Sequence, residues 1–322
     1  MGRRILLPDQ LGDVFDVHEA HGAGVGRGRL HGRDLETPFP GLRARIDPDP
    51  SDPEPDDPYL RQRRARTERA RLYARRMPDS QHISHESAAA LWGGPVPLAF
   101  GPDDRIAEAS NLPVHVTVIG DGPLPRTAGV ARHRGRADRT FVTEHDGIRL
   151  ATPATTWASL GALSVVDLVA LGDYFCRVWR QGRGRPTPGR APLATIDELR
   201  AATGSGRRFG IGRLRQAVEW IREDSWSPRE SAVRCVLMGA GLPEPELNVD
   251  IYHEGRFLGC ADLVYASRRV IVEYHGMLHG ASWAADVERI AAFRAAGWTV
   301  IDVTAPLLRR PDDLIARVRR AL

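Results

Sequence analysis

The chain has 322 residues, of which 42% are hydrophobic and 27% charged, so we expect two folded domains and not a disordered chain. No apolar run approaches the roughly 20 residues of a bilayer-spanning helix, which argues against a membrane protein and favours a cytoplasmic one. The three cysteines are widely spaced and form no Cys-x-x-Cys pair, so the sequence suggests neither a disulfide framework nor a zinc module.

The charge of the chain is unevenly distributed. The net charge of +4 permits a nucleic-acid partner without requiring one. Residues 61–76 carry eight Arg against one Glu, and residues 177–222 carry eleven Arg against three acids, whereas residues 227–322 are balanced. We therefore expect the last region to depend on its neighbours to attract a polyanion. The alternative is that both basic stretches are solvated helix faces and loops.

Three regions follow one another along the chain. Residues 1–58 are expected to be an N-terminal extension and an acidic, proline-rich linker, because the composition of IDPDPSDPEPDDPY (46–59) cannot bury a core. Residues 59–224 are expected to form a mixed α/β domain whose first helix begins after Pro58. Residues 225–322 are expected to form a separate, nuclease-like domain.

The middle region alternates between helical and strand patterns. Ser84 is a candidate N-cap for a short helix that ends before Gly93. The predicted strands are 114–120, 129–135 and 147–153, and the predicted helices lie within 155–180, 195–200 and 211–222.

The last region has the order α-β-β-β-α-β-α, so the chain as a whole is predicted to be α/β, of the α+β kind. Ser227 is the expected N-cap of its first helix and Pro228 the first helical residue. The third strand is mostly apolar and is expected at the centre of a sheet. The predicted helices are 228–240, 286–296 and 311–322, and the predicted strands are 247–253, 257–266, 270–276 and 298–304.

Three acids in this region form a candidate metal site. Asp262 lies in the second strand, and Glu273 lies in the apolar third strand, where a carboxylate is costly unless it is paired or bound to a metal. Neighbouring strands would bring the two together, and Glu230 on the preceding helix adds a third oxygen donor. Three carboxylates suit Mg²⁺ or Mn²⁺, and such an ion polarises a phosphodiester and lowers the pKa of the attacking water.

Residues 227–322 resemble the PD-(D/E)xK nuclease superfamily, in particular domains similar to very-short-patch-repair (Vsr-like) endonucleases in actinobacterial proteins. The segments that carry the resemblance are SPRES, ADLVY, VIVEYHG, His279, the pair Asp286 and Arg289, and AAGWTVIDVT. The resemblance implies a restriction-endonuclease-like fold, with Asp262 and Glu273 as the main metal ligands and Glu230 assisting them.

The resemblance also identifies a departure from the family pattern. The superfamily usually has lysine two residues after the glutamate, and this chain has His275. Because imidazole titrates near neutral pH, His275 is predicted to orient or deprotonate the attacking water, with His279 as a second candidate. Arg289 is either a phosphate clamp or the partner of Asp286 in a surface ion pair.

Each candidate also has a structural interpretation. Ser227 and Glu230 have the spacing of a capping box, in which the glutamate bonds the amide of the N-cap residue. Asp262 is able to end a strand or brace a turn. His275 and His279 are able to serve as ordinary hydrogen-bonded polar residues.

The middle region loosely resembles type IV (abortive-infection) antitoxins, through ISHESAAALWG, VHVTV, GVARHRG and TPATTWASLGA. That resemblance implies a module that binds nucleic acid or a partner protein. His82 and His85 have a ligand-like spacing, but without a matching Cys or acid we expect them to cap or pack.

Three functions follow from these expectations. The first is a Mg²⁺-dependent (or Mn²⁺-dependent) endodeoxyribonuclease that acts on DNA, in repair or in phage defence. The second is a non-catalytic DNA-binding regulator of the antitoxin type with a decayed nuclease fold. The third is a protein-binding module in phage defence. No membrane partner is expected, and the sequence leaves open a homodimer or a partner from a defence system.

Overall fold

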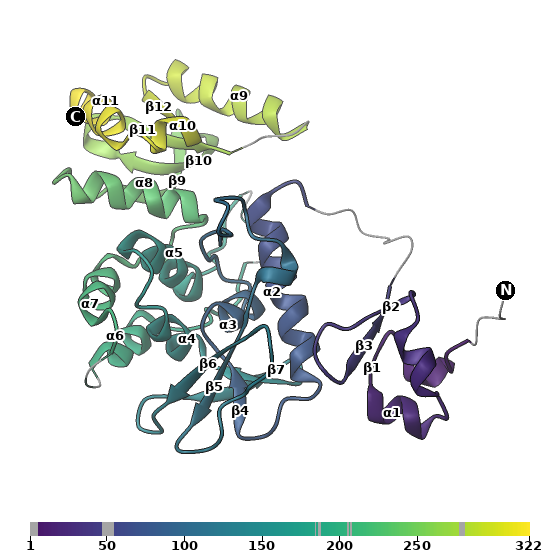
Figure 1. Ribbon diagram of the computed structural model, residues 1–322. Helices are drawn as coiled ribbons and strands as arrows, with labels where there is room; N and C mark the ends of the chain where they lie inside the picture. Colours follow the sequence, from purple (N-terminus) through teal and green to yellow (C-terminus); the bar gives the residue numbers. More distant parts are fainter. Residues whose placement is uncertain are drawn as a thin grey trace. The chain divides into compact units, whose positions relative to one another are not determined.

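The computed structural model describes residues 6–46, 55–183, 185, 188–204, 206, 208–276 and 281–322, with side chains from residue 284 onward in the last range. Its contacts divide the chain into two compact units, Met1–Leu160 and Gly161–Leu322 (Figure 1). The described residues form helices and three separate sheets, which confirms the expected α+β class. No helix in the described ranges is long and apolar enough to cross a membrane.

The first part of unit Met1–Leu160 is a small packed body, which differs from the expected extension. A three-stranded antiparallel sheet has the order β1-β3-β2. Asp16 caps α1 by accepting from the amide of His18, while Glu19 accepts from the amide of Asp16. Its core is Leu7, Leu11, Phe15, Ala20, Val25 and Leu30. The elements are η1 (Asp9–Leu11), β1 (Val14–Asp16), α1 (Val17–Gly22), η2 (Arg27–His31), β2 (Leu35–Glu36) and β3 (Leu42–Arg45).

The second part of the same unit contains a five-stranded mixed sheet in the order β6-β5-β4-β8-β7. Its strands are β4 (Gln81–Ile83), β5 (Val114–Ile119), β6 (Val130–Gly135), β7 (Val142–His145) and β8 (Ile148–Ala151). The three strands predicted here are confirmed as β5, β6 and β8. The sequence patterns miss β4 and β7, which are only three and four residues long.

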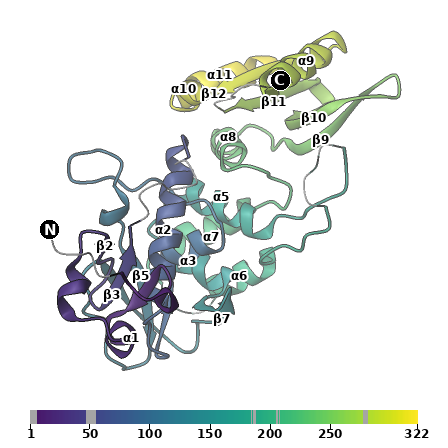
Figure 2. The same ribbon diagram turned by 90° about the vertical axis from the view of Figure 1, so that its right-hand side faces the viewer.

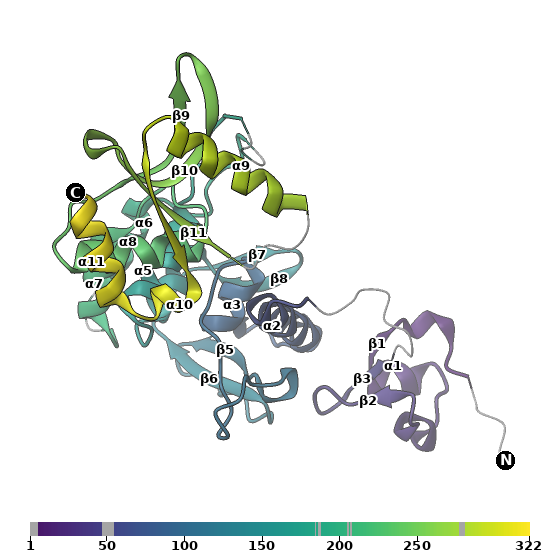
Figure 3. The same cartoon turned by 90° about the horizontal axis from the view of Figure 1, so that it is seen from above.

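Helices α2 (Pro58–Ala74), α3 (His85–Leu91) and α4 (Pro153–Ser159) accompany this sheet, and η3 (Ala109–Asn111) precedes β5. Figure 3 shows α2 beside α3. Ala70 and Tyr73 of α2 share one core cluster with Ile83 of β4 and Val116 of β5. The cluster holds the start of α3 against β4 and β5.

Unit Gly161–Leu322 begins with helices α5 (Val165–Cys176), α6 (Ile196–Gly204) and α7 (Ile211–Trp220), followed by α8 (Pro228–Gly239). Asp173 of α5 and Arg234 of α8 form a fully buried ion pair at 2.6 Å. Because this pair ties α5 to α8, the predicted boundary near residues 224–227 lies inside the unit.

The rest of this unit follows the predicted order of elements, with a short extra helix after the last strand. The mostly apolar β11 lies between β10 and β12 in the sheet order β12-β11-β10-β9, as expected, with β12 parallel to it. The elements are β9 (Glu246–His253), β10 (Arg256–Tyr265), η4 (Ala266–Arg268), β11 (Val270–His275), α9 (Ala281–Ala295), β12 (Thr299–Thr304), α10 (Ala305–Leu308) and α11 (Pro311–Ala321).

Helices cover both faces of this sheet (Figure 2). Val233 of α8 and Leu314 of α11 pack against one face, in a cluster that includes Val272. Phe293 of α9 packs against the other face, in a cluster that includes Ile271. Since residues two apart on a strand share a face, Glu273 lies on the α9 side of β11.

Candidate functional site

Asp262 and Glu273 lie side by side on neighbouring strands, as predicted. The antiparallel register pairs Leu263 with Val272, so the next step outward places Asp262 opposite Glu273. The amide of Asp262 donates to Glu273 Oε1 at 3.3 Å, and the amide of Tyr274 donates to Asp262 Oδ2 at 2.9 Å. The carboxylate of Glu273 is therefore held by an amide of β10, and the carboxylate of Asp262 is held by an amide of β11.

Glu273 has a cationic partner in this structure. Its side chain is only 1% exposed, and Arg289 Nη1 donates to both of its oxygens at 3.1 and 3.0 Å. The same guanidinium bonds Asp286 Oδ1 at 3.0 Å and the carbonyl of Cys260 at 2.9 Å. Arg289 thus faces the acids. Its guanidinium binds Asp286 and Glu273 together, so the contact with Asp286 is not an isolated surface ion pair.

Glu230 is anchored by the start of α8. Its amide donates to Ser227 Oγ at 3.2 Å, which completes half of the predicted capping box. Its carboxylate accepts from the amide of Trp226 and from Asn248 Nδ2, both at 2.9 Å, and not from the amide of Ser227. Glu230 therefore serves as a helix brace.

The negative charges of Glu273 and Glu230 nevertheless act on Asp262. Burial, followed by the charges of Glu273 and Glu230, raises the pKa of Asp262 well above its usual value. Burial also raises the pKa of Glu273, against the opposing effect of Arg289, and burial raises the pKa of Glu230. Such a group favours the addition of a proton or a cation.

His275 follows Glu273 at the end of β11 on the same side of the strand. Its Nε2 lies 2.8 Å from Asp302 Oδ1, and Arg294 Nη2 donates to the other oxygen of Asp302 at 2.5 Å. This partner holds the imidazole in place and leaves Nδ1 as the nitrogen available to a ligand. His279 lies outside the described residues.

The predicted acids do not converge on one point with a third ligand. In the described part of the chain, one set of three His, Cys, Asp or Glu side chains has its ligand atoms all within 4.8 Å of one another, and that set is His85, His115 and His133. Glu230, held by its helix cap, and His275, held by Asp302, are in no such set with Asp262 and Glu273.

The sequence analysis missed this histidine set. His85 begins α3, His115 lies on β5, and His133 lies on the adjacent β6. Within the set, only His85 has another histidine at a ligand-like spacing, and that residue, His82, is not a member of the set. The pairing of two strands and a helix start creates the cluster, and no local pattern reports it.

The two basic stretches are largely engaged within the protein. In residues 61–76, Arg63 donates to the carbonyl of Gly93, and Arg69 donates to the carbonyl of Leu112. In residues 177–222, Arg180 pairs with Asp224 and Arg222 pairs with Glu244, among others. The arginines paired with acids therefore contribute less to attracting a polyanion, whereas bonds to carbonyls leave the charges of Arg63 and Arg69 in place.

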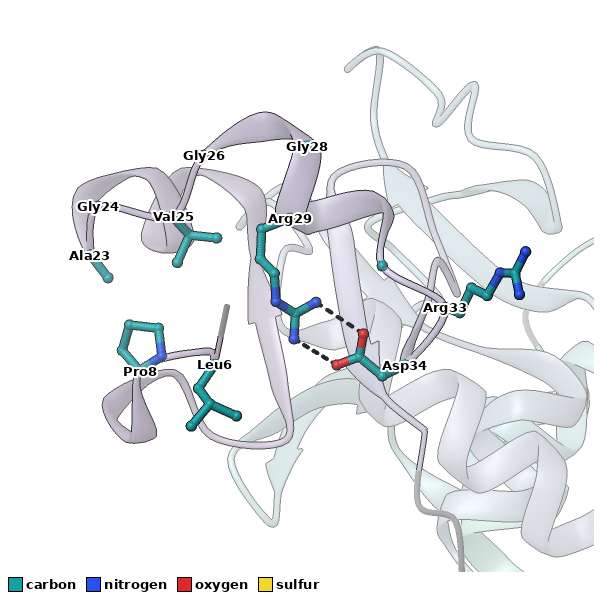
Figure 4. A pocket seen from close by; sticks show the side chains of 11 residues that line it. Leu6, Pro8, Ala23, Gly24, Val25, Gly26, Gly28, Arg29, Arg33 and Asp34 are labelled. Atoms are coloured by element: carbon teal, nitrogen blue, oxygen red, sulfur yellow. Dashed lines mark hydrogen bonds and ion pairs between the residues drawn. The ribbon is translucent and has the colours of Figure 1, made fainter. Parts of the chain in front are cut away.

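A pocket of about 1040 Å³ lies in the N-terminal body, between the chain start and the glycine-rich segment before β2 (Figure 4). Arg29 lies on its wall and donates to both oxygens of Asp34, at 3.0 and 2.6 Å. Because this guanidinium faces a carboxylate within the wall, the pocket offers no ready anion site.

Comparisons with known proteins leave the family open. No family model and no solved structure matches the chain. Two proteins of Mycobacterium tuberculosis, uncharacterized protein MT2308 of strain CDC 1551 / Oshkosh and uncharacterized protein Rv2248 of strain ATCC 25618 / H37Rv, are each 32% identical to it over 121 residues. The match covers 36% of this chain and 44% of each relative, so the chain spans less than half of their length.

Proposed function

We propose that the protein is a cytoplasmic, Mg²⁺-dependent DNA endonuclease whose site is built on Asp262 and Glu273. The observation that carries this proposal is the direct apposition of two largely buried carboxylates on β10 and β11, joined by the 3.3 Å bond from the amide of Asp262 to Glu273. The resemblance of residues 227–322 to Vsr-like domains supports the choice of substrate.

The charges of the site fit a hard divalent cation. One guanidinium, that of Arg289, serves both Glu273 and Asp286, and Asp262 adds a further carboxylate. The group therefore carries surplus negative charge in a buried place, which oxygen-preferring cations offset. When bound, Mg²⁺ supplies polarisation of the phosphodiester and a lower pKa for the attacking water.

The side chains of the protein have separate tasks in this proposal. Asp262 and Glu273 hold the cation, and Glu230 keeps the start of α8 in place beside them. His275, fixed by Asp302, accepts the proton of the attacking water. Arg289 exchanges its bonds to Glu273 for a phosphate oxygen of the DNA, since a guanidinium binds both groups in the same manner.

The contacts of Arg289 and Glu230 also support a second function, that of a non-catalytic DNA-binding regulator. Arg289 already satisfies both oxygens of Glu273, and Glu230 is committed to Trp226 and Asn248. A DNA-binding regulator with a decayed nuclease fold would keep such contacts permanently and bind no cation. Binding of Mg²⁺ therefore separates the two functions.

Calorimetric titration of the full chain with Mg²⁺ provides this test. The nuclease proposal predicts one binding event that is lost in Asp262→Asn and in Glu273→Gln, because each variant removes a negative oxygen ligand but keeps the shape of the side chain. Glu254→Gln, at the exposed β9–β10 turn, is the matched control and should bind as the wild type does. Absence of Mg²⁺ binding by the wild type would favour the regulator.

A further inference from the structure

We propose that His85, His115 and His133 form a binding site for a divalent transition-metal ion of the Zn²⁺ class. Their three ligand nitrogens all lie within 4.8 Å of one another. Imidazole nitrogens suit Zn²⁺ and its neighbours and not the hard ions that carboxylates prefer. This site lies in unit Met1–Leu160 and is independent of the acids proposed to hold Mg²⁺.

The spacing of the rings is close to that of ligands around one ion. His115 Nδ1 and His133 Nε2 are 3.0 Å apart, and two ligands of a tetrahedral zinc with Zn–N bonds of about 2.0–2.1 Å lie about 3.3–3.4 Å apart. The rings of His85 and His133 are stacked, with centroids 3.6 Å apart. The His115–His133 contact is a hydrogen bond in this structure, and the rings are nearly parallel, so an ion would replace that bond and the rings would rotate to point their nitrogens at it.

Side chains next to the histidines indicate which ring nitrogen of each would face the ion. Glu86 Oε2 lies 3.2 Å from His115 Nε2, an ion-pair distance without hydrogen-bond geometry, so the carboxylate lies on the Nε2 side of the ring and Nδ1 faces His133. Ser84 Oγ lies 2.9 Å from His85 Nδ1, which leaves Nε2. A carboxylate or hydroxyl on the distal nitrogen is the usual support of a metal-binding histidine.

The backbone at His85 lies in the left-handed region. Its φ is 49°, in the left-handed region that non-glycine residues rarely adopt at a cost of about 1–3 kcal/mol. The conformation places a histidine, and not a glycine or asparagine, at the first position of α3.

The surrounding charges and exposure are compatible with a cation. The buried Arg66 brings a positive charge to this region, which the carboxylate of Glu86 offsets. All three ligands are half-buried, so none of them is closed off from solvent.

Metal binding by the tag-free full chain, stripped with EDTA, tests the proposal. We expect one equivalent of Zn²⁺ to remain bound after dialysis, and Co²⁺ to give the visible absorption of a tetrahedral site. Saturating Zn²⁺ should raise the melting temperature by roughly 5–10 °C, as expected for a ligand at about 100 times its Kd.

Variants of two proposed ligands, and one variant of a residue beside them, test whether these histidines bind the ion. His133→Ala, on the edge strand β6, and His85→Asn, which tolerates the left-handed backbone, should each lower Zn²⁺ affinity by more than about 100-fold, beyond the range for outer contacts. Glu86→Gln, which keeps all three ligands, should lower it by about 10–100-fold.

His253→Ala removes an exposed histidine of β9 and should bind as the wild type does. Circular dichroism of each variant confirms its folding. Failure of the wild type to retain Zn²⁺, or retention that is unchanged in folded His133→Ala, would overturn the proposal.

Discussion

At the residue scale, the least replaceable polar pair of the described chain is Asp173 with Arg234. The exposed fractions of their side chains are 2% and 0%. Asp173 also accepts from Ser231 Oγ at 2.6 Å and from the amide of Arg222 at 2.7 Å. A buried ion pair adds little stability by itself, but removing one member leaves an uncompensated charge in the core.

We therefore expect Arg234→Met to lower the free energy of unfolding of unit Gly161–Leu322 by about 3–5 kcal/mol. Urea denaturation followed by tryptophan fluorescence measures this change. Arg215→Met, at an exposed position of α7, is the control and should change the free energy by less than about 0.5 kcal/mol. Equal effects of the two substitutions on the free energy of unfolding would contradict a specific contribution of the buried Asp173–Arg234 pair.

For Glu273, the sequence predicts that the side chain needs a partner but not which residue provides it. A carboxylate in an apolar strand predicts a partner, and this prediction identifies the site on chemical grounds alone. The sequence did not show that Arg289, sixteen positions away, would supply the partner, because that contact depends on how α9 packs over β11. The capping box predicted from the spacing of Ser227 and Glu230 is half present, since the amide of Glu230 donates to Ser227 Oγ but the carboxylate of Glu230 accepts from Trp226 and Asn248 instead of Ser227.

At the element scale, β10 is bent where it passes Arg289. Its register with β9 shifts between Phe257 and Gly259, which marks a β-bulge. A Cβ added to Gly259 would lie 2.6 Å from Arg289 Cδ, 2.7 Å from Arg289 Cγ and 3.2 Å from Phe293 Cζ. The bulge and the glycine together let α9 approach the strand closely enough for Arg289 to reach Glu273.

Gly259→Ala should therefore displace Arg289 and destabilise the unit by about 1–3 kcal/mol, the usual cost of overpacking. The substitution should cost less in an Arg289→Ala background, because the overlapping side chain is then absent. A double-mutant cycle measures this coupling. Gly239→Ala, where the added methyl would meet only Trp220 at 3.8 Å, should change the free energy by less than about 0.5 kcal/mol. Full additivity of the first pair would contradict the assignment.

Most of the elements that the sequence did not predict are short, although the four-residue β8 was predicted. The helices and strands from α8 to α11 were predicted in the correct order because each main element carries several turns or alternations and a capping or turn residue. Strands β4 and β7 and the strands of the N-terminal body have two to four residues, which is too short for a period to be visible. The packed core of residues 6–46 was missed for the same reason.

At the scale of the whole molecule, the sites lie in separate units with different donor atoms. Unit Gly161–Leu322 offers carboxylate oxygens at Asp262 and Glu273, and unit Met1–Leu160 offers imidazole nitrogens at His85, His115 and His133. The apposition of Asp262 and Glu273 was predictable because they lie on two consecutive strands. The nitrogen site was not predictable, since it requires the parallel pairing of β5 with β6 and the position of α3 beside them.

Cleavage of duplex DNA by the full chain tests the central claim most directly. The proposed nuclease should cut DNA with Mg²⁺ or Mn²⁺ and stop when EDTA removes the ion. Asp262→Ala and Glu273→Ala should each lower the rate by at least ~100-fold, since each removes a ligand of the ion, while Glu254→Gln should cut as the wild type does. If the wild type cuts no DNA with either ion, or if both alanine variants cut at its rate, then Asp262 and Glu273 do not form a nuclease site.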